Sequence, residues 1–486
     1  MKLRGVGHFS MGLDTTKTIS SETQVKQATD LELNMPQQSP LTRIPLHTVD
    51  FDEVPKQQFR VYTARDLDKI KELQSLPESL RFEMKVVSAV LPFRVNAYVI
   101  EELIDWQQVP NDPIFQLTFP QKGMLSDVHY NRMAMAMRSD MDKQALKLVA
   151  NEIRQELNPH PAGQLEHNVP CDSEGEPILG LQHKYRETVL FFPSQGQTCH
   201  SYCSFCFRWA QFVGDKNLRM ATTEADKLYG YLEEHPEVTD LLVTGGDPMV
   251  MKSRQLKTYL EPLLHPRFSH IQTVRIGTKA LTFWPQRFIT DDDADELVEL
   301  LHHLVLAGKH VAIMAHYNHW RELDTDIARA AIRRLRATGA EIRSQGPLLA
   351  HINDCADDWV RLWNEQIKLG IIPYYQFVER DTGARRYFEV PLYKAWQIYR
   401  QAMQKVSGLG RTARGPSMSA DPGKVEIQGI AEMNGQKVFV LRFIQARDPS
   451  WVQQPFFAKF DEQATWFDQL QPADEHSERF FRKPAI

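Results

Sequence analysis

Two patterns of hydrophobic and polar residues alternate through the centre of the chain. Short runs rich in β-branched and aromatic residues alternate with longer windows that place apolar residues at helical spacing. The strand-like runs occupy residues 188–194, 240–246, 273–279, 310–317, 341–348 and 371–378, and the helical windows occupy 223–235, 253–264, 292–308, 324–339 and 357–370. Strand followed by helix, about six times, indicates parallel strands joined by helical crossovers. Because six units are too few for the closed eight-unit barrel, the pattern predicts an α/β fold with a partial (β/α)6 TIM-like barrel.

The segments on either side of this alternation have different patterns. Helical spacing before it, for example at 126–157, predicts an N-terminal helical region that ends in an extended linker. Strand-like runs after it, at 424–430 and 436–446, predict a C-terminal α+β extension. The expected boundaries are 1–45 for a polar, disordered tail, 46–185 for the helical region and linker, 186–407 for the barrel and 408–486 for the extension.

Composition narrows the class of protein. The 486 residues are 42% hydrophobic and 24% charged, with a formal net charge of −5, which is ordinary for a soluble globular protein. No basic stretch suggests a nucleic-acid partner, and no run approaches the roughly 20 apolar residues that span a bilayer. The first residues lack the apolar core of a secretory signal, so we expect a cytoplasmic protein. In that reducing compartment, clustered cysteines indicate metal or redox chemistry before disulfides.

Three of the five cysteines stand within eight residues, in the stretch "CHSYCSFC". Cys199, Cys203 and Cys206 follow the first predicted strand directly, and the ends of parallel strands face the active site of such folds. Four-iron clusters normally take four cysteines, so three thiolates would leave one iron open for chemistry. Zinc would need a fourth ligand, and only His200 lies within the loop. The sequence favours a [4Fe-4S] cluster over zinc, and an electron-transfer or sensing protein stays an alternative.

The CxxxCxxC loop at the end of a first barrel strand resembles the radical S-adenosylmethionine (SAM) superfamily. Further stretches, in the same order and spacing, resemble lysine 2,3-aminomutase and its relatives over roughly residues 50–430. They are "GLQHKYRETVLF", "CHSYCSFCFR", "DLLVTGGDPM", "VRIGTKALTFWPQRF", "AHYNHWREL", "SQGPLLAHINDC" and "IPYYQFVERDTG". The resemblance implies a barrel of the radical SAM type and an isomerase that moves the α-amino group of an amino acid to its β-carbon.

The cofactors that the resemblance implies are a [4Fe-4S] cluster, SAM at the open iron and pyridoxal 5'-phosphate (PLP). An electron donor such as flavodoxin or ferredoxin is implied as a partner, and homo-oligomer formation stays open. The "TGGDP" stretch matches the family's segment for the SAM ammonium group, which assigns Gly245, Gly246 and Asp247 to SAM binding. Two glycines let a backbone approach a ligand closely. His316 and Gln345, which we expect at the ends of the fourth and fifth strands, match positions that approach SAM.

The resemblance also assigns residues to the substrate and to PLP. Arg208 matches the family arginine that binds the substrate α-carboxylate, which an arginine fork suits. Lys424 matches the lysine that binds PLP, although the family's glycine run is reduced here to the turn at residues 421–423. Cys355 matches a zinc-binding cysteine of clostridial relatives, but no cysteine follows it, so we expect no zinc. Cys171 is expected to be an ordinary thiol.

The positions expected to bind the substrate side chain depart from the family. In the lysine enzyme two aspartates hold the distal ammonium, and here an ungapped reading places Arg380 and Ser417 at those positions. An arginine beside an ammonium in a shielded site would cost several kcal/mol. The departure therefore predicts a substrate with an anionic or neutral side chain, such as glutamate. Alternatives are that Arg380 pairs with a nearby carboxylate and lysine is the substrate, or that a radical SAM enzyme without PLP acts on another substrate.

Overall fold

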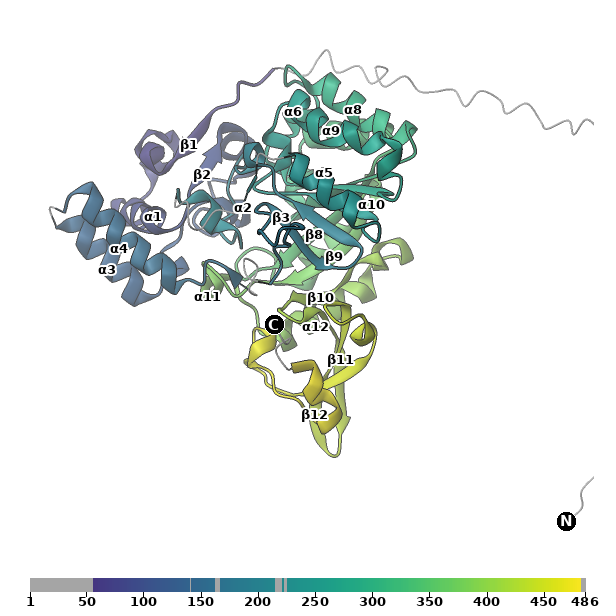
Figure 1. The fold of residues 1–486 in the computed structure, drawn as a ribbon. Coiled ribbons are helices and arrows are strands. Elements are labelled where there is room, and N and C mark those ends of the chain that lie inside the picture. Colours follow the sequence, from purple (N-terminus) through teal and green to yellow (C-terminus); the bar gives the residue numbers. More distant parts are fainter. Residues whose placement is uncertain (1–55, 140, 162–166, 215–220, 223–224, 482–486) are drawn as a thin grey trace, which may run out of the picture. The chain divides into compact units, whose positions relative to one another are not determined.

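A computed structural model describes residues 56–139, 141–161, 167–214, 221–222 and 225–481 (Figure 1). The tail expected at 1–45 lies outside the described residues. Within the described residues, no helix is both long enough and apolar enough to cross a membrane.

One sheet of eleven strands dominates the described part of the chain, in the order β13-β12-β11-β10-β9-β8-β7-β6-β5-β4-β3. The seven neighbours from β4 to β10 are parallel, and the outer pairings are antiparallel. The strands are β3 (Leu181–Tyr185), β4 (Thr188–Phe191), β5 (Asp240–Val243), β6 (Thr273–Thr278), β7 (His310–His316), β8 (Glu341–Leu348), β9 (Ile372–Val378), β10 (Arg414–Ser419), β11 (Gly423–Met433), β12 (Gln436–Ala446) and β13 (Pro455–Lys459), with a separate pair β1 (Val61–Thr63) and β2 (Arg94–Asn96). The fold is therefore mixed α/β with a largely parallel sheet.

Helices connect the parallel strands and form most of the N-terminal region. They are α1 (Glu78–Val90), α2 (Pro113–Thr118), α3 (Asp127–Arg138), α4 (Lys143–Glu156), α5 (Ala225–Glu234), α6 (Ser253–Leu260), α7 (Ala280–Phe283), α8 (Ala294–Leu306), α9 (Asp326–Ala337), α10 (Ala356–Lys368), α11 (Arg385–Phe388), α12 (Leu392–Lys405) and α13 (Glu475–Glu478). Local sequence explains several boundaries. For example, Thr325 caps α9 by accepting a hydrogen bond from the N–H of Ala328.

The six predicted strands are all present at the predicted places, but the structure adds a seventh parallel strand, β10. Its sequence, "RGPSMS", carries Gly, Pro and two Ser, so it lacks the β-branched pattern that marks a buried strand. The predicted helix at 126–157 is two helices, because Asp142 caps a new N-terminus at α4. Residues 64–76 also carry apolar residues at helical spacing, but they form two short 3-10 helices instead of an α-helix.

Three groups of buried apolar side chains stabilise these regions. One lies between the parallel strands and their crossover helices, and a second lies among the C-terminal strands. The third joins the N-terminal helices to Phe205 and Trp209, which follow the second cysteine of the "CHSYCSFC" stretch. The N-terminal region therefore shares a core with the loop that carries the cysteines.

Candidate active site

The three clustered cysteines lie in the loop after β4, here called the cysteine loop (residues 196–212). The N-terminal region supports this loop through its backbone. The side chain of Asn96, fully buried, donates to the carbonyl oxygen of His200 (3.4 Å), and its backbone N–H donates to Ser201 Oγ (3.0 Å). The N–H of Tyr202 donates to the carbonyl oxygen of Arg94 (2.8 Å). Asn96 was not predicted from the sequence, because its partners are more than 100 residues away in the chain.

The chemistry of the three thiols fits a metal cluster. Burial raises the pKa of each thiol, that of Cys206 to about 11, and charge on Cys206 raises the pKa of both Cys199 and Cys203. Thiols this close together resist ionisation, because their thiolates would repel one another. They become thiolate ligands when a positively charged metal centre binds and displaces their protons. Among the residues that the structure describes, no three His, Cys, Asp or Glu side chains are arranged to bind a single metal ion. Three thiols in one loop are a donor set that a four-iron cluster with one open iron would accept.

The glycine loop after β5 packs directly on the cysteine loop. A Cβ at Gly246 would overlap the backbone of Thr198, so only glycine permits this approach. Asp247 is 2% exposed, and its carboxylate accepts from Thr278 Oγ1 (2.7 Å), the N–H of Met249 (2.9 Å) and the N–H of Lys279 (2.8 Å). Asp247 therefore ties the ends of β5 and β6 to the cysteine loop, and its oxygens are occupied by these donors.

His316 and Gln345 lie side by side. They are register partners on β7 and β8, although Gln345 stands three residues before the end of its strand. The ring of His316 stacks on Phe205 of the cysteine loop (centroids 5.7 Å apart). Burial lowers the pKa of His316 well below its usual value, and Nδ1 finds no hydrogen-bond partner in the described residues. An unpartnered buried nitrogen beside the cysteine loop is suited to a polar ligand.

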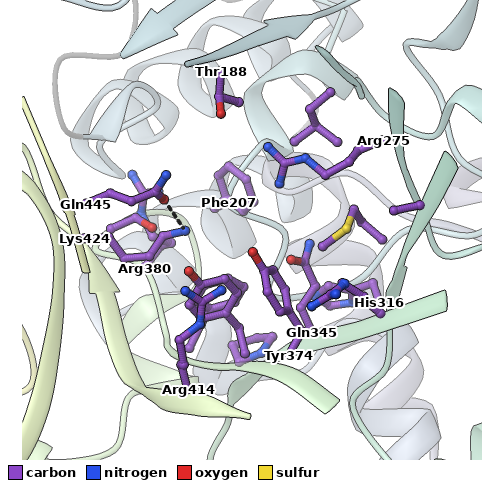
Figure 2. A pocket seen from close by; sticks show the side chains of 18 of the residues that line it. Thr188, Phe207, Arg275, His316, Gln345, Tyr374, Arg380, Arg414, Lys424 and Gln445 are labelled. Carbon is purple, nitrogen blue, oxygen red and sulfur yellow. Dashed lines mark hydrogen bonds between the residues drawn. The ribbon is translucent and has the colours of Figure 1, made fainter. Parts of the chain in front are cut away.

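A cavity of about 600 Å³ adjoins a smaller one of about 210 Å³, and Lys424 lines both; together they are here called the lysine cavity. Every parallel strand from β4 to β10 contributes lining residues to the larger part. Figure 2 shows Lys424 and Gln445 entering from the C-terminal strands, with His316 and Gln345 on the other side. The cavity thus joins the surroundings of the cysteine loop to the C-terminal extension.

Lys424 is the second residue of β11 and lies among aromatic and cationic side chains. Its Nζ donates to Gln445 Oε1 (3.3 Å) and lies 4.3 Å from the centroid of the Tyr375 ring. Burial, with smaller effects from Arg275 and Arg414, lowers the pKa of Lys424 to about 7. A buried lysine with a lowered pKa is an activated nucleophile, which fits covalent attachment of PLP.

Two predicted arginines line this cavity. Arg208 is held by the carbonyl oxygen of Gly245 (2.9 Å), and burial lowers its pKa to about 10. Arg380 lines both parts of the cavity with 18% of its side chain exposed. The nearest carboxylate oxygen is Asp381 Oδ1, 3.9 Å from Arg380 Nε, and Nε has no hydrogen-bond partner among the described residues. Glu389, another candidate partner, pairs with Arg385 instead.

Lys184 of β3 is a cavity residue that the sequence did not reveal. It lines the smaller part and donates from Nζ to the carbonyl oxygen of Ala420 (2.6 Å). Burial, with repulsion from Arg447 and Arg380, lowers its pKa to about 7. The only sequence cue was its place in the stretch "GLQHKYRETVLF", where nothing separates it from a surface lysine.

Ser417 and the remaining cysteines lie apart from this chemistry. Ser417 is fully buried, with Oγ 3.5 Å from the carbonyl oxygen of Gln376, and it does not line the lysine cavity. Cys171 and Cys355 are exposed. The sequence-predicted residues that the structure gathers at one cavity are therefore Lys424, Arg208, Arg380, His316 and Gln345.

The chain is similar to curated proteins over most of its length. It is 31% identical over 399 residues to a putative L-lysine 2,3-aminomutase of Aquifex aeolicus, covering 82% of this chain and 93% of the relative. It is 23% identical to the L-lysine 2,3-aminomutase of Bacillus subtilis, covering 79% of this chain and 71% of that protein. No family model matches the chain.

Among solved structures, Streptococcus suis SuiB bound to S-adenosylmethionine aligns with 57% of each chain, at 12% identity and a TM-score of 0.32. A likeness this weak carries no argument about function.

Proposed function

The chain belongs to the lysine 2,3-aminomutase family of radical SAM isomerases, and on that premise we propose that it is a PLP-dependent amino-acid 2,3-aminomutase whose substrate has an anionic side chain. The observation that carries the proposal is the lysine cavity, where a lysine with a lowered pKa stands with Arg208 and Arg380, and the described residues bring no carboxylate oxygen closer than 3.9 Å to the guanidinium of Arg380.

The family implies three cofactors, and this chain offers residues for each. Cys199, Cys203 and Cys206 would hold a [4Fe-4S] cluster, and Lys424 would hold PLP. The backbone at Gly246 and the side chain of His316 would face SAM. When bound, these groups supply a radical that removes a substrate hydrogen and a conjugated ring that allows the amino group to migrate. We expect SAM between the cysteine loop and the cavity, because Phe205 and His316 meet there.

The protein's own residues bind and orient the substrate. Arg208 lines the smaller part of the cavity, and its guanidinium is suited to the α-carboxylate that every amino acid carries. Lys424 would hold PLP, because an amine whose pKa is lowered to about 7 is largely neutral, and so nucleophilic, above that pH. The aromatic wall of Phe207 and Tyr375 excludes water from the reacting atoms.

Charge in the cavity favours an acidic substrate. Arg414 also lines it and contacts the rings of Tyr374 and Tyr375 rather than a carboxylate. The cofactor phosphate and the substrate α-carboxylate balance part of this positive charge, and Arg380 remains for a second carboxylate. A glutamate-like side chain would meet it, whereas the ammonium of lysine would be repelled.

Lysine is the second candidate substrate, because one carboxyl group lines the same cavity without a partner. Glu379 is 4% exposed, and its Oε1 has no hydrogen-bond partner in the described residues. Burial raises the pKa of Glu379 well above its usual range, which favours the neutral acid. The side-chain ammonium of lysine would have to bind next to the like-charged Arg380 and draw the proton from Glu379. Lysine is therefore the weaker candidate substrate.

The finer points of the fold and the cell location also stay proposals. Because seven parallel strands line one cavity, we infer that the sheet curves into a partial barrel. The boundaries 46–185, 186–407 and 408–486, and the cytoplasmic location, stay predictions.

Anaerobic reconstitution with iron, sulfide, SAM and PLP tests the proposal. Lysine, glutamate, aspartate and glutamine are supplied in turn, and β-amino products are measured by mass spectrometry. We expect the β-isomer of glutamate, and we expect Arg380→Ala to lower kcat/KM for glutamate about 30-fold or more, from a loss of ~2 kcal/mol. Arg386→Ala, an exposed neighbour, is the control. Preference for lysine would refute the substrate, and SAM cleavage without any β-isomer would favour an enzyme that acts on another substrate.

A further inference from the structure

A second large cavity, of about 650 Å³, opens on the outer side of the cysteine loop, and it is here called the outer cavity. It shares no lining residue with the lysine cavity. Cys199 and His200 line it, whereas Cys203 and Cys206 line neither of these cavities. A molecule in the outer cavity would therefore touch the cysteine loop without obstructing the substrate.

An exposed aromatic ring stands at this cavity beside the cysteine loop. Phe59 is 40% exposed, and its ring lies edge-on to His200 (5.7 Å between centroids) and to Trp284 (4.8 Å). His200 is 6% exposed, and its Nδ1 has no hydrogen-bond partner in the described part of the chain. Exposed aromatic residues with buried polar neighbours are common at the centres of protein–protein interfaces.

The charge of the outer cavity is opposite to that of the whole chain. Its lining includes four cationic side chains, of Lys56, Arg94, Lys252 and Arg287, and two carboxylates, whereas the chain has a formal net charge of −5. The side chains of Lys56 and Lys252 are 67% and 59% exposed. Lys56 pairs with Asp292 in solvent, where such a pair contributes little. Lys252 pairs with Asp293, which is 13% exposed and also pairs with Arg287, so with Asp293 counted the four cations meet three carboxylates and a small positive excess remains. A local positive patch on an acidic protein attracts an acidic partner.

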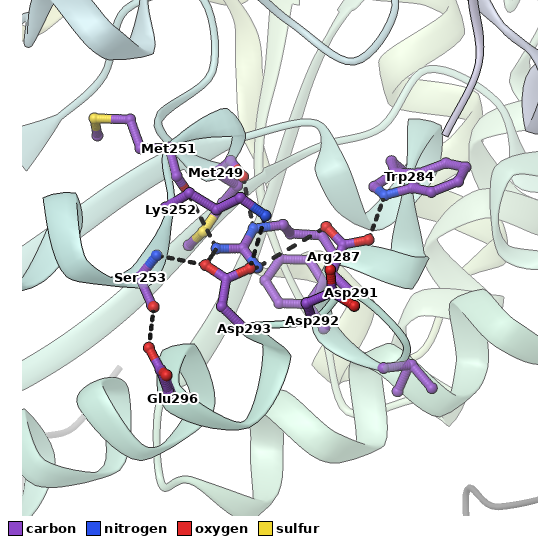
Figure 3. Close-up of polar contacts among 12 residues, drawn as sticks. Met249, Met251, Lys252, Ser253, Trp284, Arg287, Asp291, Asp292, Asp293 and Glu296 are labelled. Carbon is purple, nitrogen blue, oxygen red and sulfur yellow. Dashed lines mark hydrogen bonds and ion pairs between the residues drawn. The ribbon is translucent and has the colours of Figure 1, made fainter. Parts of the chain in front are cut away.

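One wall of the outer cavity is held rigidly (Figure 3). Arg287 is 2% exposed; it donates from Nε to the carbonyl oxygen of Met249 (2.8 Å) and from Nη2 to that of Met251 (3.0 Å). Its guanidinium also pairs with both carboxylate oxygens of Asp293 (3.1 and 3.2 Å). Trp284 is fixed by a hydrogen bond from Nε1 to Asp291 Oδ1 (3.0 Å). A surface that is already ordered binds a partner with little loss of conformational entropy.

We propose that the outer cavity is the docking site of the electron donor, a small acidic one-electron carrier protein. The proposal rests on the proposed function, which requires an electron at the cysteine loop. The lysine cavity must exclude water around the substrate, so the electron enters from the other side. One electron leaves the carrier and is accepted at the iron–sulfur cluster; the carrier is oxidised and the cluster reduced by that single electron, without transfer of a proton.

The test compares charge-reversal variants on the reconstituted full chain, with flavodoxin hydroquinone as the probe. The double variant Lys56→Glu, Lys252→Glu removes the positive rim. Lys257→Glu is the matched control. Lys257 lies on helix α6, which begins directly after Lys252; it is 58% exposed and does not line the cavity. Two quantities are measured at low and high salt: the dissociation constant for flavodoxin, and the rate at which flavodoxin bleaches the visible absorbance of the cluster.

At low salt we expect the double variant to bind flavodoxin about tenfold more weakly and to be reduced about tenfold more slowly, with the difference shrinking at high salt. Lys257→Glu stays like the unmodified protein, and SAM cleavage driven by dithionite is equal in all three. Equal losses in the double variant and the control, no loss in either, or an unmodified protein that dithionite reduces but flavodoxin does not, would overturn the docking site. Absence of SAM cleavage with dithionite would instead overturn the proposed function.

Discussion

The cysteine loop and strand β11 both contribute residues to the lysine cavity, but they acquire their chemistry in different ways. The loop carries its three thiols within eight residues, so the donor set is local in the chain, and distant residues such as Asn96 only support it. Lys424 is a single residue, and its low pKa comes from burial and from Arg275 and Arg414 on other strands. The loop therefore owes its chemistry to its own sequence, whereas the lysine owes its chemistry to its surroundings.

The largest expected effect separates the two regions completely. Cys203→Ser should remove iron binding and abolish SAM cleavage, because two thiolates cannot hold the cluster, while PLP attachment at Lys424 persists. Iron content per chain and the mass of the borohydride-reduced Lys424 peptide measure the two functions. Cys355→Ser, at an exposed cysteine, should retain full iron. If Cys203→Ser lost both iron binding and PLP attachment while Cys355→Ser kept them, the two regions would fold as one cooperative unit.

The converse variant is Lys424→Ala. It should lose the visible absorbance of protein-bound PLP and all aminomutase activity, yet retain iron and SAM cleavage. Lys437→Ala, at an exposed lysine of β12, serves as the control. If PLP absorbance survived in Lys424→Ala, another lysine would hold the cofactor, and Lys184 would be the first to examine, since burial lowers its pKa to about 7 as well.

A smaller effect is expected from the close approach of two loops. Gly246→Ala places a methyl group into the backbone of Thr198 and should destabilise the protein by about 1–3 kcal/mol, with reduced iron loading. Gly230→Ala in α5 meets no atom within 4 Å and should be neutral or stabilising, by up to about 1 kcal/mol. Urea denaturation of both variants measures the difference. Equal free energies of unfolding for the two variants would show that the glycine loop accommodates the methyl group without loss of stability.

The smallest expected effect is on pH dependence. A neutral amine is needed to bind PLP covalently, and the pKa of Lys424 is lowered to about 7, so attachment should rise through pH 7 and level off above it. Arg414→Gln removes one of the charges that lower this pKa, so its curve should move to higher pH. Absorbance titration follows both curves. A midpoint near the ordinary lysine value, unchanged by Arg414→Gln, would show that the cavity does not tune the amine.

The same contrast explains what the sequence predicted and what it did not. The six strands and the cysteine loop were predictable because runs of β-branched and aromatic residues and a three-thiol spacing are local properties. Strand β10 was not, since its Gly, Pro and Ser residues form a strand only between β9 and β11. Lys184 was missed for a similar reason: its burial depends on C-terminal strands more than 200 residues away. Arg380 was expected at the site from the family resemblance, two residues after the last predicted strand, and it lines the cavity.

The short turn between β10 and β11 also limits how this protein could evolve. Ser419 pairs with Lys424 across the turn, and the next residue, Val425, belongs to the buried apolar group of the C-terminal strands. Successive side chains of a strand point to opposite faces, so inserting one residue before Lys424 would exchange the two, and lysine would enter an apolar interior. The turn should therefore tolerate an insertion of two residues, or one that a bulge absorbs, more readily than an insertion of a single residue.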